Sequence, residues 1–234
     1  MNELNHRIFS TRCRSKRLLY IVANSKPLEY STSQQVGQLF LNAFLQKHPE
    51  YQVETLNLFD IDLPQPNHRH FISRAEIVSG SAFEALSEAD QQTVHRMLDL
   101  CQTFKSADRY VIVAPMWTLS FPYKLKQYLD CIILHGQTIS ISEKEVVGLL
   151  KEKTRKAMYI QSSADMFPFN TMTIPLIKTR VNHGITYVYD VFRFLGIDCL
   201  DPLLIQGTEV DSTGDKQAIT MSAKQIKRMC QQFE

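Results

Sequence analysis

Glycine is scarce in this sequence, with eight residues among 234. The turn after the first predicted strand contains neither Gly-x-Gly-x-x-Gly nor Gly-x-x-x-x-Gly-Lys. Those patterns mark the dinucleotide-binding fingerprint and the P-loop, where glycine lets the backbone approach a phosphate closely. Their absence argues against both kinds of nucleotide site.

Cysteine and histidine are too scattered for a disulfide framework or a metal centre. The five cysteines are Cys13, Cys101, Cys131, Cys199 and Cys230, and no Cys-x-x-Cys pair occurs. The odd number and wide spacing favour reduced thiols in the core of a cytoplasmic protein. The seven histidines form no metal-ligand set, and His68 and His70 are predicted in an exposed loop. No Gly-x-Ser-x-Gly elbow or Cys-His pairing indicates nucleophilic catalysis.

The sequence also lacks a strong charge of one sign and a long apolar run. The formal net charge is +2, which argues against nucleic acid or an anionic membrane as a partner. No stretch approaches the roughly 20 apolar residues of a membrane span. The apolar run at residues 18–23 is shorter than the roughly 7–15 residues of a signal-peptide core. It is interpreted as a first strand preceded by a basic tail, residues 1–16.

Apolar segments with the character of strands alternate with helical patterns along the chain. Five strands are predicted, at residues 17–24, 51–58, 110–114, 157–161 and 200–205. Segments with apolar residues at helical spacing lie between them. This alternation predicts one α/β domain over residues 17–234, built on a parallel sheet. Residues 60–83 are predicted as an irregular loop, and residues 137–155 as an excursion with a short hairpin.

Hydroxyl side chains gather where the first strand turns into the first helix. Ser25 follows the strand, and Ser31, Thr32 and Ser33 stand at the expected helix start. A helix N-terminus offers free backbone N–H groups and a favourable dipole to a phosphate. A serine at this position is also an ordinary N-cap. From these residues alone, both interpretations stay open.

The segment from Ala114 to Pro122 joins the third predicted strand to a helix. It reads Ala-Pro-Met-Trp-Thr-Leu-Ser-Phe-Pro and continues as Tyr-Lys-Leu-Lys-Gln-Tyr-Leu-Asp. A buried strand that turns here into a proline-initiated helix presents backbone and the flat ring of Trp117 at the carboxyl edge of a sheet. Ligands bind at that edge in open α/β folds. Such a surface suits a planar cofactor.

These motifs resemble the flavodoxin-like FMN-dependent NAD(P)H oxidoreductases of the azoreductase and quinone reductase type. That family has a strand-end serine followed six residues later by Ser-x-Ser, as Ser25 is followed by residues 31–33. Its Ala-Pro-Met-Tyr-Asn-Phe-x-x-Pro block is similar to residues 114–122. Two further family segments match Gly-Gln-Thr-Ile at 136–139 and Phe-Leu-Gly-Ile at 194–197. The resemblance covers residues 17–208.

The resemblance implies contacts with FMN. The phosphate would be held by Ser25, Ser31, Thr32 and Ser33. The edge of the isoalloxazine ring would be lined by Pro115, Met116, Trp117, Thr118 and Leu119, with backbone N–H groups near the flavin N5 atom. Trp117 stands where the family commonly has Tyr, and Thr118 where it commonly has Asn. Trp117 and Phe167 are expected to line the substrate pocket.

The end of the fourth predicted strand departs from the family pattern. Members typically have Ser-Arg-Gly-Gly beside the pyrimidine end of the flavin, and the matching cofactor-binding residues here are Ser162, Ser163, Ala164 and Asp165. Glycine permits a close backbone approach that other residues obstruct. A carboxylate near N1 opposes the negative charge of a reduced flavin. This run favours an alternative, a degenerate flavodoxin-like binding protein or electron carrier with weak or no FMN binding.

The resemblance implies a doubly wound, five-stranded parallel sheet of order 2-1-3-4-5 with helices on both faces, and FMN where the strand order reverses. It implies hydride transfer from NADH or NADPH through FMN to a quinone, azo or nitro acceptor. The flavin carries this chemistry, so no catalytic acid or base is assigned. A cytoplasmic homodimer is expected. Some members were once labelled acyl-carrier-protein phosphodiesterase, an alternative that the missing metal and nucleophile motifs argue against.

Overall fold

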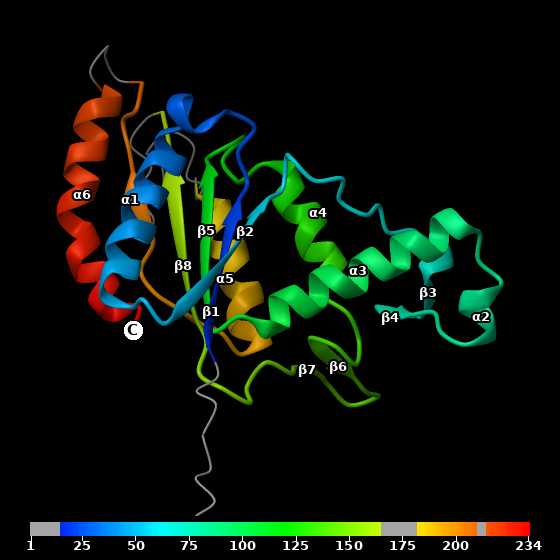
Figure 1. The fold of residues 1–234 in the computed structure, drawn as a ribbon. Helices are drawn as coiled ribbons and strands as arrows, with labels where there is room; N and C mark the ends of the chain where they lie inside the picture. The colour runs from blue at the N-terminus through cyan, green and yellow to red at the C-terminus, as the bar shows by residue number, and fades with distance from the viewer. Residues whose placement is uncertain (1–14, 165–181, 210–213) are drawn as a thin grey trace, which may run out of the picture.

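The computed structural model describes residues 15–164, 182–209 and 214–234. Its centre is a parallel sheet in the order β10-β8-β5-β1-β2 (Figure 1). The strands are β1 (Lys16–Val22), β2 (Tyr51–Asn57), β5 (Arg109–Pro115), β8 (Lys156–Ser162) and β10 (Leu203–Ile205). This is the predicted order 2-1-3-4-5, so the doubly wound sheet is confirmed. Of the predicted fifth strand, 200–205, only β10 forms, and a separate strand, β9 (Asp198–Cys199), precedes it and also pairs with β8. Pro202 lies between the two, and proline cannot donate to a strand ladder.

Helices cover both faces of the sheet, as expected (Figure 1). One face packs against α1 (Thr32–Lys47) and α6 (Gly214–Gln232), and the other against α3 (Glu88–Ser106), α4 (Tyr123–Ile132) and α5 (His183–Leu195). In β1, Leu18 and Tyr20 belong to the core on the side of α1 and α6. Leu19 and Ile21 belong to the core on the side of α3, α4 and α5. A strand buried on both faces is apolar throughout, which explains the uninterrupted run in the sequence.

Residues 60–83 are not the irregular loop that the sequence predicts. They hold the 3₁₀ turn η2 (His68–His70), the antiparallel pair β3 (Phe71–Ser73) and β4 (Glu76–Ile77), and α2 (Ser81–Glu84). The prediction that His70 is exposed was wrong, since it is 1% exposed and its Nε2 lies 2.9 Å from Asp90 Oδ1. Elements this short leave no readable period. The hairpin predicted within 137–155 is confirmed by β6 (Ile139–Ile141) and β7 (Val146–Gly148).

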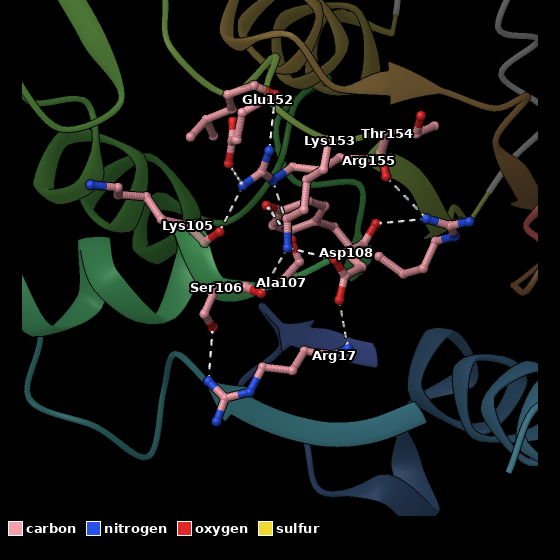
Figure 2. Close-up of polar contacts among 12 residues, drawn as sticks. Arg17, Lys105, Ser106, Ala107, Asp108, Glu152, Lys153, Thr154 and Arg155 are labelled. Atoms are coloured by element: carbon pink, nitrogen blue, oxygen red, sulfur yellow. Dashed lines mark hydrogen bonds and ion pairs between the residues drawn. The ribbon is translucent and has the colours of Figure 1, made fainter. Parts of the chain in front are cut away.

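A cluster of hydrogen-bonded polar residues lies at the amino end of the sheet (Figure 2). Arg155, just before β8, is 1% exposed, and it donates to Glu152 Oε1 at 2.5 Å. Its guanidinium also donates to the backbone carbonyls of Lys105, Ala107 and Leu150. Asp108 accepts from Lys153 Nζ at 2.5 Å and from the Arg17 backbone N–H at 2.8 Å. These contacts tie β1, β5 and β8 together at the end opposite the expected ligand edge.

Candidate functional site

A cleft of about 240 Å³ lies at the carboxyl edge of the sheet. The ends of β1, β5 and β8, the loop after β10 and the starts of α1 and α6 all contribute to it. Its lining residues are Asn24, Lys26, Tyr30, Ser31, Thr32, Pro115, Met116, Trp117, Ser162, Ser163, Ala164, Thr208, Glu209 and Asp215. The cleft spans the boundary between β1 and β5, where the strand order reverses. Ligands bind at such a switch point in doubly wound folds.

Asn24 organises the hydroxyl groups at the start of α1. This side chain is 4% exposed, and its Nδ2 donates to Ser31 Oγ at 2.7 Å and to Ser33 Oγ at 3.2 Å. The two serine oxygens lie 3.3 Å apart, and Ser31 also accepts from the Gln34 N–H as the N-cap. One hydrogen bond joins the two hydroxyl groups, and it uses the hydrogen of only one serine. The hydroxyl hydrogen of the other serine has no acceptor among the described residues. Together with the unpaired N–H groups of the first helical turn, it is available to an anion.

Two of the four hydroxyl residues predicted to hold a phosphate line the cleft. Ser31 and Thr32 line the cleft, where Thr32 Oγ1 donates to Asp215 Oδ1 at 3.0 Å. Ser33 is fully buried behind Ser31 and does not line the cleft. Ser25 is exposed and also lies outside the lining, just before the 3₁₀ turn η1 (Leu28–Tyr30). At Ser31 the N-cap role and the phosphate-binding role are compatible. As the N-cap, its hydroxyl oxygen accepts a hydrogen bond, and its hydroxyl hydrogen stays available to donate.

Residues 117–120 form a tight two-residue turn at the mouth of the cleft. Trp117 and Ser120 exchange both backbone hydrogen bonds, at 3.2 Å and 2.8 Å. The central residues, Thr118 and Leu119, have φ values of 47° and 61°. Positive φ at both central positions is the pattern of a type I′ turn, which glycine and asparagine favour. A β-branched residue in this region is a conformational outlier, and such strain is concentrated at functional sites.

This turn also determines which backbone N–H groups are left for a ligand. The Met116 N–H donates to the Ser162 carbonyl at 2.7 Å, and the Trp117 N–H is used within the turn. Pro115 has no N–H. In the described part of the chain, the N–H groups of Thr118 and Leu119 find no acceptor. Of the predicted flavin-lining segment, these two are therefore the donors that remain.

Relieving the strain at Thr118 is expected to stabilise the protein. Asparagine tolerates the left-handed region better than threonine does, so Thr118→Asn should raise the free energy of unfolding by about 1 kcal/mol. Thr118→Val keeps the branched side chain and should give no gain. Urea denaturation of the three proteins measures the difference. Equal stability of Thr118→Asn and the unmodified chain would show that the turn stores no strain.

The end of β8 forms one wall of the cleft. Ser162, Ser163 and Ala164, three of the residues predicted to bind the cofactor, all line it. The Ser163 N–H donates to the Ile205 carbonyl at 2.9 Å, and the Ala164 carbonyl accepts from the Glu209 N–H at 3.2 Å. The wall is thereby joined to β10 and to the loop after it. Asp165 and Phe167 lie outside the described residues.

Several lining residues were not predicted. Asn24 was interpreted as the last residue of an apolar strand, although a polar residue after Ala23 signals that the strand has reached the ligand edge. Thr208 and Glu209 follow the fifth strand, so the rule that ligands lie beyond carboxyl ends of strands would have found them. Lys26, Tyr30 and Asp215 reach the cleft because η1 and α6 pack against α1. No local sequence pattern predicts that packing.

Neither thiols nor metal ligands give the cleft a reactive group of its own. The described cysteines are free, and burial raises the pKa of Cys101 to about 11 and that of Cys131 to about 12. Thiols with such pKa values are poor nucleophiles at neutral pH. Within the described ranges, no group of three or more His, Cys, Asp or Glu side chains is arranged to hold a metal ion. In the same ranges, no helix combines the length and apolar character needed to cross a membrane.

Comparison with known proteins places this fold and cleft in a family. A family described by its flavodoxin-like fold matches residues 16–229. The chain belongs to this flavodoxin-like family. It is 40% identical over 219 residues to FMN-dependent NADH:quinone oxidoreductase 1 of Clostridium acetobutylicum, which covers 94% of this chain and 96% of that protein. It is 38% identical over 218 residues to an FMN-dependent NADH:quinone oxidoreductase of Ruminiclostridium cellulolyticum, covering 93% and 100%.

A solved structure supports the same relationship. The FMN-dependent NADH-azoreductase of Bacillus anthracis, crystallised in complex with FMN, superposes with a TM-score of 0.73 at 26% identity. The match covers 93% of this chain and 99% of that one. The predicted resemblance to flavodoxin-like FMN-dependent oxidoreductases of the azoreductase and quinone reductase type is therefore confirmed.

The cleft of this flavodoxin-like chain fits FMN by the chemistry of its donors. At one end, the Ser31–Ser33 pair retains a hydroxyl hydrogen beside the start of α1, which suits a phosphate. At the other end, Pro115, Met116 and Trp117 give an apolar wall for a planar ring. The strained turn beside them leaves the Thr118 and Leu119 N–H groups to meet polar atoms at a ring edge.

Proposed function

We propose that this protein is an FMN-dependent oxidoreductase that transfers two electrons from NADH to a quinone or azo acceptor. The observation that carries the proposal is one cleft at the β1–β5 switch point, with hydroxyl donors at one end and Pro115, Met116 and Trp117 at the other. The names of its relatives, which are FMN-dependent NADH:quinone oxidoreductases and an NADH-azoreductase, support the same activity.

Each part of the cleft has a role in this activity. Bound in this cleft, FMN would supply two-electron redox chemistry, in which a hydride from the nicotinamide would pass as two electrons to the acceptor, and the acceptor would also take up protons to become a hydroquinone or hydrazo compound. Ser31 and Thr32 would hold the phosphate. Ser25 and Ser33 would support phosphate binding from positions outside the cleft lining. Pro115, Met116 and Trp117 would support the ring, and Thr118 and Leu119 would donate N–H groups to its edge. Ser162, Ser163 and Ala164 would flank the pyrimidine end.

Further parts of the proposal concern assembly and substrate. Exposed apolar side chains near the cleft support a homodimer with the site at the interface: Trp117, Leu119, Tyr123 and Tyr187 are 36–62% exposed. Trp117 would also line the substrate pocket, where its ring is held edge-on by Phe59 with centroids 6.1 Å apart. We place the protein in the cytoplasm and treat residues 17–234 as one domain.

Steady-state kinetics test the proposed function. Under anaerobic conditions, protein supplied with FMN should oxidise NADH over many turnovers only when a benzoquinone or an azo dye is present, and varying both substrates should give the parallel reciprocal plots of a ping-pong reaction. NADPH, tested alongside, should be the weaker donor. Protein stripped of flavin is the control and should be inactive. A chain that added FMN cannot colour would instead support the degenerate binding protein.

A further inference from the structure

Two carboxylates line the cleft, and one of them, Asp215, lies at the end assigned to the phosphate. Asp215, in the first turn of α6, accepts from Thr32 Oγ1 at 3.0 Å, and Thr32 is the middle residue of the hydroxyl segment. Glu209, in the loop after β10, lines the same cleft. Lys26 is the cation among the described lining residues. The described lining residues therefore carry a net charge of −1, from one cation and two anions.

A flavin phosphate adds about −1.5 to −2 charges at neutral pH. Hydroxyls and backbone N–H groups can bind its oxygens, but they bring no countercharge. Like charges a few ångströms apart disfavour each other even near solvent. FMN thus enters a site whose hydrogen-bond donors attract its phosphate and whose net charge repels it.

We propose that Asp215, together with Glu209, lowers the affinity for FMN by acting on its phosphate, so that the cofactor is bound less tightly than the hydroxyl and N–H donors alone would hold it. This inference rests on the proposed function, because it requires the flavin phosphate to lie beside Ser31 and Thr32. It assigns the carboxylates an effect on cofactor affinity and no role in the reaction.

The competing explanation is that Asp215 stabilises α6. An acid in the first turn interacts favourably with the helix dipole. That role would change thermal stability when the charge is removed, but it would not distinguish flavins with and without a phosphate. Riboflavin, which is FMN without the phosphate, is therefore the probe that separates the two roles.

The test is a fluorescence-quenching titration of flavin-free protein with FMN and with riboflavin. Asp215→Asn keeps an oxygen to accept from Thr32 and removes the charge, so the Kd for FMN should fall about tenfold, while the Kd for riboflavin stays unchanged. Glu209→Gln should act in the same direction, and Lys26→Met in the opposite one. Asp99→Asn, at an exposed position on α3, is the matched control for net charge. It should leave both constants unchanged.

Salt gives an independent readout. Because the site repels the phosphate, raising the salt concentration should tighten FMN binding to the unmodified protein and leave riboflavin unaffected. Unchanged FMN affinity in Asp215→Asn, or an equal change for both flavins, overturns this inference and leaves the proposed function intact. A chain that binds neither flavin overturns both.

Discussion

Replacing Asn24 with leucine is expected to weaken FMN binding about 100-fold, which corresponds to about 2.7 kcal/mol. The amide Nδ2 donates to the hydroxyl oxygens of Ser31 and Ser33, and Oδ1 accepts from the Lys26 N–H at 2.9 Å. Leucine has a similar size but neither donor nor acceptor. The serine hydroxyls would then lose the contact that orients them, and the turn from β1 to α1 would lose its anchor.

The matched control lies on the same helix. Asn42 is exposed on α1 and accepts from Gln38 Nε2, so Asn42→Leu should leave FMN affinity unchanged. Affinity is measured by the same fluorescence titration, and thermal unfolding without flavin shows how much of the effect is lost stability. If Asn24→Leu binds FMN as tightly as Asn42→Leu does, Asn24 has no part in ordering the phosphate site.

Replacing Arg155 with methionine is expected to lower the free energy of unfolding by about 3–5 kcal/mol. Methionine fills much of the same space, but three backbone carbonyls lose their donor, and a buried polar group without a partner costs about 1–3 kcal/mol. The carbonyls belong to the end of α3 and to the segments leading into β5 and β8 (Figure 2). The amino end of the sheet would lose the hydrogen bonds that Arg155 makes between these segments.

Glu152→Gln separates the carbonyl contacts from the ion pair. The Glu152 side chain is 60% exposed, so its pairing with Arg155 is partly screened by solvent, and its loss should cost less than about 1 kcal/mol. Chemical denaturation compares the two variants. Similar losses in both would mean that the ion pair, and not the carbonyl contacts, holds this end of the sheet. FMN affinity of folded Arg155→Met should stay unchanged, because the cluster lies at the opposite end of the strands.

The parts of the structure that the sequence predicts are those governed by local patterns. β1, β5 and β8 are buried on both faces, so their apolar runs identify them within about two residues. The hydroxyls at the start of α1 and the Pro115–Leu119 segment follow strands directly, so the switch-point rule locates them. The strand order brings Ser31, Thr32 and residues 115–117 into one cleft.

The parts that escaped prediction depend on contacts between distant segments or on elements too short to show a period. Thr118 and Leu119 have positive φ although neither residue type favours it, so only the surrounding fold reveals the turn. Asp215 meets Thr32 across 183 positions of sequence. His70 is buried because β3, β4 and the start of α3 enclose it, and strands of two or three residues leave no alternation to read.

The central claim is that FMN binds in this cleft and carries electrons there. The most direct measurement is an anaerobic absorption spectrum of the purified protein after FMN is added and the excess is removed. If FMN binds in the cleft, a flavin spectrum should stay with the protein, NADH should bleach it, and a quinone should restore it. A protein that emerges colourless, or one whose flavin bands NADH leaves unchanged, would contradict the account.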